Sequence, residues 1–196
     1  MGKDTDSVTV AFRPVEESDM PRIRHIYDYY VNLSTVTFDY ETPSIETMTE
    51  TMRDITKHYP YIVCTKDSEV IGYAYAHAIS PREAYKWTVE LSIYLAREAC
   101  GQGYGQALYT RLLKLLHVQN VQTAYACVTS PNPESERMHR KMGFTLLSTW
   151  TRSGYKFGQW RDVVWFEKRL GNCPSPTLEL IDFKQLPQET LKEILG

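Results

Sequence analysis

Apolar and polar residues follow two different periods along the chain. A period of two, typical of strands, covers residues 8–12 and 87–95, and five further segments read as strands, at 61–65, 70–78, 122–128, 146–153 and 161–168. A period near 3.6, typical of helices with one buried face, covers the segments that begin near residues 21, 45, 106, 133 and 188. Because strands alternate with helices, the pattern predicts one mixed α/β domain.

Local signals mark where several of these elements begin and end. We expect Ser18 or Asp19 to cap the first helix and Ser44 to cap the second, because short polar side chains accept hydrogen bonds from a helix's first N–H groups. The short helix that starts at residue 133 has Asn132 as its expected cap and ends at Gly143. The last two strands are expected to form a hairpin across residues 154–158.

The strand predicted at 87–95 contains an acidic residue. Its odd positions, from Trp87 to Leu95, are all apolar, whereas Glu90 shares the other face with Thr88 and Ser92. An acid in a strand usually faces solvent, but strands as apolar as this one tend to be central and covered on both faces. A partly buried carboxyl group has a raised pKa, which makes Glu90 a candidate general base.

A cluster of glycines separates this strand from the next helix. Gly101, Gly103 and Gly105 occupy alternate positions, so successive backbone N–H groups can point into one concavity, and the following helix adds its positive end. This arrangement suits a pyrophosphate group. The spacing differs from the dinucleotide-binding and P-loop motifs. A plain glycine-rich turn in front of a helix remains the alternative.

The short helix after Asn132 carries a histidine about two turns from its start, at His139. A single histidine on a helix is more often a surface or core residue than a catalytic group. The capping signals of Asn132 and Gly143 account for the segment without any function. The helix therefore offers a candidate site residue only in combination with the other motifs.

Composition limits the possible partners. The formal net charge is −2, from 22 basic and 24 acidic residues, which argues against a nucleic-acid-binding or membrane-binding surface. No apolar run approaches the roughly 18 residues of a membrane span, and the first residues lack a signal-peptide pattern. We therefore expect a cytoplasmic protein with reduced cysteines, of which Cys64 and Cys127 lie in apolar strands and should be buried. The five histidines lack ligand spacing, so no metal site is predicted.

The order of these motifs resembles the GNAT superfamily of acetyl-CoA-dependent N-acetyltransferases. Within it, the chain looks like the phosphinothricin or methionine sulfoximine acetyltransferases. The supporting stretches are residues 34–38, 84–90, 137–139 and 154–163. The resemblance covers residues 8–170, which we expect to form the acetyltransferase domain, and it implies a mostly antiparallel central sheet flanked by helices. Residues 171–196 form a C-terminal extension to which it assigns no role.

The resemblance implies roles for individual residues. Glu90 stands where the family has its general base, and His139 where many relatives have the acid that protonates the leaving thiolate. The amino-acid pocket would involve Phe38, Arg82 and Tyr85. Contacts to acetyl-CoA would come from the strand end, the glycine loop and the short helix, namely Ile93, Tyr94, Leu95, Cys100, Gly101, Gln102, Gly103, Tyr104, Gly105, Gln106, Asn132 and Ser135. No metal is required.

Two positions depart from the family pattern. Cys100 replaces the Gln or Arg usual at the head of the phosphate loop, so we expect weaker coenzyme binding there. Ser80 falls where relatives often have a basic residue, which favours the less anionic substrates.

The resulting hypothesis is acetyl transfer from acetyl-CoA to the amine of a small amino acid such as phosphinothricin, methionine sulfoximine or methionine sulfone. A protein or peptide amine acetyltransferase and a non-catalytic acetyl-CoA-binding module are the alternatives. The aromatic segments near Tyr29, Tyr30, Phe38 and Tyr40, together with those at 155–157, predict a homodimer.

Overall fold

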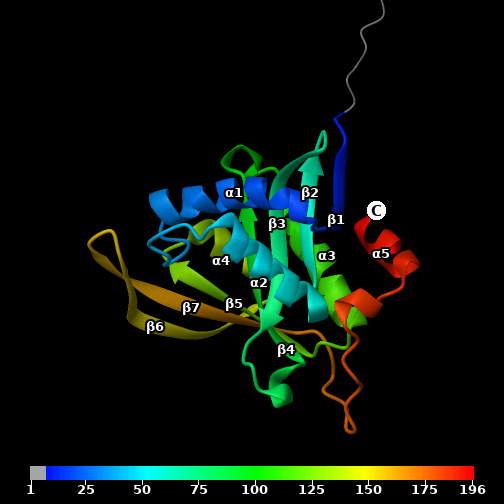
Figure 1. The fold of residues 1–196 in the computed structure, drawn as a ribbon. Helices are drawn as coiled ribbons and strands as arrows, with labels where there is room; N and C mark the ends of the chain where they lie inside the picture. Colours follow the sequence, from blue (N-terminus) through cyan, green and yellow to red (C-terminus); the bar gives the residue numbers. More distant parts are fainter. Residues whose placement is uncertain (1–7) are drawn as a thin grey trace, which may run out of the picture.

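A single seven-stranded sheet forms the centre of the computed structural model, which describes residues 8–196. The strands lie in the order β1-β2-β3-β4-β5-β7-β6 (Figure 1). All neighbours are antiparallel except β4 and β5, which are parallel. The strands are β1 Val10–Pro14, β2 Tyr61–Lys66, β3 Glu69–Ala78, β4 Thr88–Leu95, β5 Thr123–Ser130, β6 Thr145–Lys156 and β7 Gln159–Arg169. This confirms the predicted α/β fold with a mostly antiparallel sheet.

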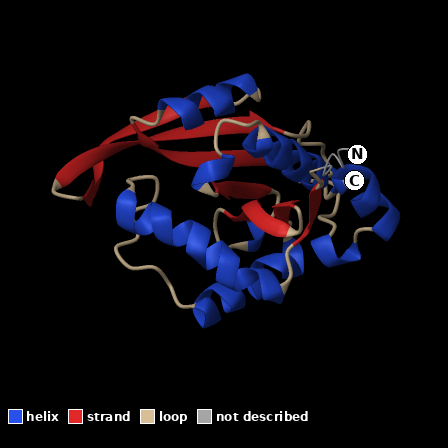
Figure 2. Ribbon diagram, turned by 90° about the horizontal axis from the view of Figure 1, so that it is seen from above, coloured by secondary structure: helices blue, strands red, loops and turns tan. Residues whose placement is uncertain are grey.

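Helices cover both faces of the sheet (Figure 2). On one face, rings of α1 pack against Tyr94 of β4, and α2 lies beside α1. On the other face, α3 approaches Gly72 through Leu108, and α4 stacks His139 on Phe166 of β7. The helices are α1 Met20–Leu33, α2 Ile45–His58, α3 Tyr104–Val118, α4 Pro133–Lys141 and α5 Gln188–Leu195, with 3₁₀ turns at Glu17–Asp19, Glu83–Tyr85, Arg97–Ala99 and Phe183–Gln185. None of the helices in the described part of the chain is long and apolar enough to span a membrane.

The two parallel strands part after three residue pairs. β4 and β5 pair only from Thr88 to Glu90 and from Thr123 to Tyr125, although both strands continue for five more residues. Beyond that point, β4 keeps only β3 as a neighbour and β5 keeps only β7. The sheet therefore opens into a wedge between the two strands.

The capping predictions are partly confirmed. Ser44 accepts a hydrogen bond from the Thr47 N–H, and Asn132 accepts one from the Ser135 N–H, each at 3.2 Å. Asp19 occupies the N-cap position of α1, as predicted, but its side chain accepts no capping hydrogen bond from the helix. Its carboxylate instead forms a bidentate pair with Arg13, with both N–O distances 2.7 Å.

The hairpin between β6 and β7 turns later than the sequence predicts. The strands continue to Lys156 and resume at Gln159, so Gly154 lies inside β6 and pairs with Arg161. The turn itself is Phe157-Gly158, with φ of 51° and 73°. Positive φ at both central residues is the geometry of a tight two-residue hairpin, and it sets the register of the pair.

The C-terminal extension packs on the same core. Leu178 O accepts a hydrogen bond from the Trp87 indole at 2.8 Å, and the buried Gln119 amide donates to both His58 O and Ile181 O at 2.7 Å. Four apolar side chains of the extension are buried in the hydrophobic core, namely Phe183, Leu186, Leu191 and Leu195. The extension thus contributes to the packing of the fold.

We expect Phe183→Ala to destabilise the whole protein. The side chain is 7% exposed within the core, so its truncation should lower the free energy of unfolding by about 3–5 kcal/mol through lost burial and a cavity. Lys184→Ala, at the neighbouring exposed position, should change it by less than about 0.5 kcal/mol. Urea unfolding of both variants measures the difference. Equal stabilities would show that the extension does not contribute to the core.

Candidate active site

A cavity of about 200 Å³ lies where β4 and β5 part. Strands, helices and the loop before α2 all contribute to its wall. The lining residues are Val36, Thr37, Phe38, Glu90, Leu91, Ser92, Ile93, Tyr94, Tyr109, Ala126, Cys127, Val128, Thr129, Asn132, Ser135 and His139. The fold therefore brings five predicted site residues that are distant in the sequence into one cavity, namely Phe38, Glu90, Asn132, Ser135 and His139.

Glu90 lies at the apex of the wedge, at the last residue pair between β4 and β5. It also pairs with His77 of β3, so the two side chains share the face that carries α1 and α2. Burial raises the pKa of the Glu90 carboxyl group, and the nearby His77 opposes this shift. A carboxyl group with a raised pKa accepts a proton more readily than an exposed glutamate.

His139 faces the cavity from the other side of the sheet. It is 2% exposed and stacks on Phe166. Its Nδ1 lies 2.8 Å from the Ser135 carbonyl oxygen, so Nδ1 carries the proton and donates it. Its Nε2 lies 3.2 Å from the Tyr109 hydroxyl and accepts from it in the neutral ring. Burial lowers the pKa of His139 below its ordinary value, so the neutral form is favoured.

Phe38 is held in the cavity wall by the β6–β7 hairpin. Its ring lies on Gly154, where any β-carbon would collide with it. The Lys156 ammonium, on a side chain that is 1% exposed, donates to Thr37 O at 2.8 Å, and the Tyr40 hydroxyl donates to Tyr155 O. Burial lowers the pKa of Lys156. The hairpin therefore fixes the loop that carries Phe38.

Backbone groups on one edge of β4 point into the wedge. Hydrogen bonds from Ala96 N to Ile71 O and from Ile79 N to Thr88 O fix the phase of the β3–β4 ladder. Because pairing alternates along antiparallel strands, the N–H and C=O groups of Leu91, Ile93 and Leu95 face away from β3. The ladder with β5 ends before these residues. Their polar groups are available to a ligand, apart from Leu95 O, which accepts from the Tyr30 hydroxyl.

The glycine loop leads from this edge to α3. Gly101 and Gly103 have φ of 75° and 88°, and the space where a β-carbon would stand is open at both. Gly103 precedes α3, and no side chain in the described part of the chain caps the helix there. The first N–H groups of α3 are therefore free to receive an anion. Cys100 begins the loop with its thiol directed at Ala96 O, and burial raises its pKa.

Two predicted substrate residues lie elsewhere in this chain. Arg82 and Tyr85 are exposed in the segment before β4, and neither lines the cavity that contains Phe38. Cys127 was predicted to be buried, which is wrong. It is exposed on the same face as Glu90 and lines the cavity, where partial desolvation and the Glu90 charge raise the pKa of its thiol to about 12. The apolar–polar alternation of β5 does not show that its neighbour β4 diverges from it before Cys127.

Sequence reasoning missed one further residue of this site. Tyr109 lies on the buried stripe of α3, which looks like ordinary core in the sequence, but its hydroxyl contacts His139 and it lines the cavity. No group of three or more His, Cys, Asp or Glu residues within 8–196 is arranged to hold a metal ion.

Comparison with known proteins places this geometry in a family. The model of the acetyltransferase (GNAT) domain matches residues 12–165. The chain belongs to the GNAT acetyltransferase family. It is 33% identical to the phosphinothricin N-acetyltransferase of Streptomyces viridochromogenes, over 85% of this chain and 91% of that one. The family match confirms the resemblance inferred from the motifs and the assignment as an acetyltransferase.

Two further relatives also align with most of this chain and over nearly their whole length. The L-methionine sulfoximine/L-methionine sulfone acetyltransferase of Pseudomonas aeruginosa is 29% identical over 83% of this chain and 96% of its own. The crystal structure of a phosphinothricin acetyltransferase from Sinorhizobium meliloti in complex with acetyl-CoA has 32% identity and a TM-score of 0.83. The match covers 90% of this chain and 97% of the chain in that crystal structure.

Protonation of His139 should destabilise the fold. Because its pKa is lowered from 6.5, its contribution to stability is complete above about pH 6.5 and is lost as the pH falls through the lowered pKa. The loss of unfolding free energy between about pH 8 and pH 5, measured in urea, should therefore be smaller for His139→Gln than for the wild type. His25→Gln, at an exposed position, should keep the full loss. If His139→Gln loses as much unfolding free energy as the wild type over this pH range, the lowered pKa does not belong to His139.

Proposed function

We propose that this protein transfers the acetyl group of acetyl-CoA to the amine of a small amino-acid-like substrate, with Glu90 as the general base. The observation that carries the proposal is the position of Glu90. It is a half-buried carboxyl group with a raised pKa, at the point where β4 and β5 part and the cavity begins. The names of the relatives, and the acetyl-CoA complex of one of them, support the donor and the substrate class.

The residues that would hold acetyl-CoA fit a long ligand with a central pyrophosphate. The free edge of β4 from Ile93 through Tyr94 to Leu95 would pair with the pantetheine amides, which are peptide-like. The loop of Cys100, Gly101, Gln102 and Gly103, followed by Tyr104, Gly105 and Gln106 at the start of α3, would hold the pyrophosphate. Asn132 and Ser135 line the cavity at the start of α4. When bound there, acetyl-CoA supplies an activated thioester.

Glu90 would prepare the amine for attack. An α-amine is protonated at neutral pH and has no lone pair to offer until a base removes the proton. Glu90 faces the α1 and α2 side of the sheet, whereas the glycine loop begins on the α3 side. The amine would then reach the acetyl carbonyl through the wedge, where the N–H groups of Ile93 and Leu95 would stabilise the developing negative charge.

His139 and Tyr109 would act on the leaving side. Both line the cavity from the face that carries α3 and α4, and their hydrogen bond is the only polar contact at the Nε2 edge among the described residues. Because Nε2 of the neutral His139 carries no proton, it would first take one up from solvent and then pass it to the departing sulfur. A thiolate leaves readily without help, because the pKa of a free thiol is roughly 8.5, so this contribution is smaller than that of Glu90.

The acceptor would be held through its carbon chain and its acidic group. Phe38 provides an apolar wall beside Glu90. Arg82 offers a planar fork that suits an oxyacid, and Tyr85 lies three residues later in the same exposed segment. Ser80 adds no positive charge, which favours methionine sulfoximine and methionine sulfone over the more anionic phosphinothricin. A cytoplasmic location fits the four cysteines, all of which are free.

We expect Glu90→Gln to lower kcat by about a hundredfold at neutral pH, because the amine then loses its base. The base must be ionised, so wild-type activity should fall as the pH drops through the raised pKa of Glu90. In the variant this limb should be replaced by a steady rise in rate with pH, because turnover then depends on the amount of free amine. Glu50→Gln, at an exposed position of α2, should keep both the rate and the limb. Near-normal turnover by Glu90→Gln would return Glu90 to a structural role.

Substrate choice distinguishes the proposal from its alternatives. Turnover is followed by the release of free thiol with acetyl-CoA as donor. We expect a higher kcat/KM for methionine sulfoximine or methionine sulfone than for lysine-containing peptides. Arg82→Ala should raise KM by about tenfold or more with little change in kcat, because the contact is equal in ground and transition states. Lys57→Ala, which also removes one exposed positive charge, should leave KM unchanged. Better turnover of peptides would favour the protein-amine alternative, and no turnover would favour the non-catalytic module.

We also propose a homodimer. The β6–β7 hairpin extends beyond the rest of the sheet (Figure 1), and four of its aromatic side chains are 47–61% exposed, namely Trp150, Tyr155, Phe157 and Trp160. This is more exposed aromatic surface than one hairpin of a soluble monomer normally carries. Light scattering at micromolar concentration should give about twice the chain mass of 22.7 kDa. A mass of one chain would contradict the proposal.

A further inference from the structure

A cavity of about 170 Å³ lies between the sheet and the layer formed by α1 and α2. Three tyrosines of β2 and β3 form its inner wall, namely Tyr61, Tyr73 and Tyr75, and α2 contributes Met48 and Ile55 to the outer wall. The tyrosine rings are stacked, with centroids 4.8–6.4 Å apart. The cavity therefore has one aromatic side and one aliphatic side.

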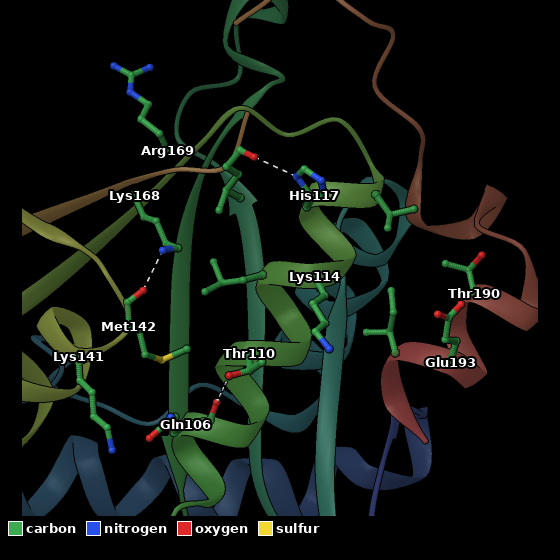
Figure 3. Close-up of a pocket in the computed structure, with 14 residues that line it drawn as sticks. Gln106, Thr110, Lys114, His117, Lys141, Met142, Lys168, Arg169, Thr190 and Glu193 are labelled. Carbon is green, nitrogen blue, oxygen red and sulfur yellow. Dashed lines mark hydrogen bonds between the residues drawn. The ribbon is translucent and has the colours of Figure 1, made fainter. Parts of the chain in front are cut away.

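Two hydroxyl groups of this cavity have no hydrogen-bond partner among residues 8–196, those of Tyr61 and Tyr73. The two side chains are 4% and 1% exposed. Burial raises the pKa of both phenols well above its ordinary value, so both stay protonated and can donate. In the groove along the outer side of α3, by contrast, the Thr110 hydroxyl and the His117 ring each have a partner within the chain (Figure 3). Because buried polar groups are normally hydrogen-bonded, the two tyrosines indicate a ligand that accepts hydrogen bonds.

The cavity wall carries a negative charge and no positive one. Asp39 lines it and accepts a hydrogen bond from the Tyr27 hydroxyl at 2.7 Å. None of its described lining residues is a lysine, an arginine or a histidine. A carboxylate repels an anion at short range, so the cavity favours an uncharged group over an anionic one. Together with the two phenol donors, this selects a neutral group whose oxygen atoms accept hydrogen bonds.

Tyr75 connects this cavity to the wedge. It pairs with Ser92, which lines the wedge, and it is a diagonal neighbour of Glu90 across the β3–β4 ladder. Such neighbours lie about 7–8 Å apart. Burial raises the pKa of Tyr75, and the charge of Glu90 adds to this shift, so the two groups interact. An amino acid whose amine lies at Glu90 can therefore reach the cavity with a side chain of methionine length.

We propose that this cavity binds the sulfone or sulfoximine group of the acceptor, with the hydroxyls of Tyr61 and Tyr73 donating to its oxygen. The inference deepens the proposed function and rests on it, because it assumes a small amino acid as the acceptor. A sulfonyl oxygen accepts hydrogen bonds although the group has no net charge, so Asp39 does not repel it. Met48 and Ile55 suit the methyl group and the methylenes of the chain. The anionic phosphinate of phosphinothricin would meet the Asp39 carboxylate without a compensating cation.

The test compares methionine sulfone with methionine, which differ only in the two sulfonyl oxygens. The wild type should acetylate methionine sulfone with a kcat/KM about tenfold or more above that of methionine, because unpaired phenols penalise the thioether. In the double variant Tyr61→Phe/Tyr73→Phe, which keeps both rings, this ratio should fall below about threefold. Tyr125→Phe, which also loses a phenol hydroxyl but lies outside the cavity, should keep the wild-type ratio. Thermal melting checks that the variants remain folded.

A second variant changes only the charge of the wall. Asp39→Asn keeps the shape of the side chain and removes its negative charge, so kcat/KM for phosphinothricin should rise about fivefold or more relative to that for methionine sulfone. Asp54→Asn, at an exposed position of α2 outside the cavity, should leave this ratio unchanged.

A wild type that acetylates methionine and methionine sulfone equally well would overturn the inference. So would an unchanged ratio in Tyr61→Phe/Tyr73→Phe, which would mean that the two hydroxyls bind ordered water only, and so would an unchanged ratio in Asp39→Asn. Each of these results leaves the proposed function intact, since the amino acid is still acetylated. A protein that acetylates no amino acid would instead refute the proposed function, and the inference with it.

Discussion

The ending of the β4–β5 ladder after three residue pairs is the constraint on which the site depends. A strand that loses a neighbour leaves a row of backbone N–H and C=O groups without partners, which is normally costly when they are buried. Here each strand keeps a full ladder on its other side, with β3 or with β7, so only one edge of each is open. The open edges form walls of a cavity to which both backbone groups and polar side chains contribute.

The parting also connects two environments that the sheet otherwise separates. Glu90 lies on the face covered by α1 and α2, where burial raises its pKa. His139 lies on the face covered by α3 and α4, where burial lowers its pKa. The same physical cause therefore makes the carboxyl group a better base and keeps the imidazole neutral. In the proposed reaction, the acceptor approaches from the first face and the donor from the second.

Strand and helix positions could be predicted well from the sequence, because the periods of two and 3.6 are set by which side of each element is buried. Glu90 and the glycine loop were also visible, since each breaks its local pattern in a way that has a chemical use. The strand neighbours of β4 could not be predicted, because the alternation of apolar and polar residues does not show where a neighbouring strand diverges. This is why Cys127 was wrongly expected to be buried, whereas Tyr109 does lie in the core and only its hydroxyl group reaches His139. The late turn at Phe157-Gly158 was missed because its first residue adopts a positive φ that glycine usually provides.

The most direct test of the account is amide hydrogen exchange along β4, with and without saturating acetyl-CoA. The amides of Leu91, Ile93 and Leu95 face the wedge, whereas those of Ser92 and Tyr94 are paired with β3 in the free protein. The account predicts that acetyl-CoA slows exchange at the wedge-facing amides near Ile93 and Leu95 and leaves Ser92 and Tyr94 nearly unchanged. Unaltered exchange at Ile93 and Leu95, under conditions where calorimetry shows the coenzyme bound, would contradict the claim that the parted edge of β4 holds the donor.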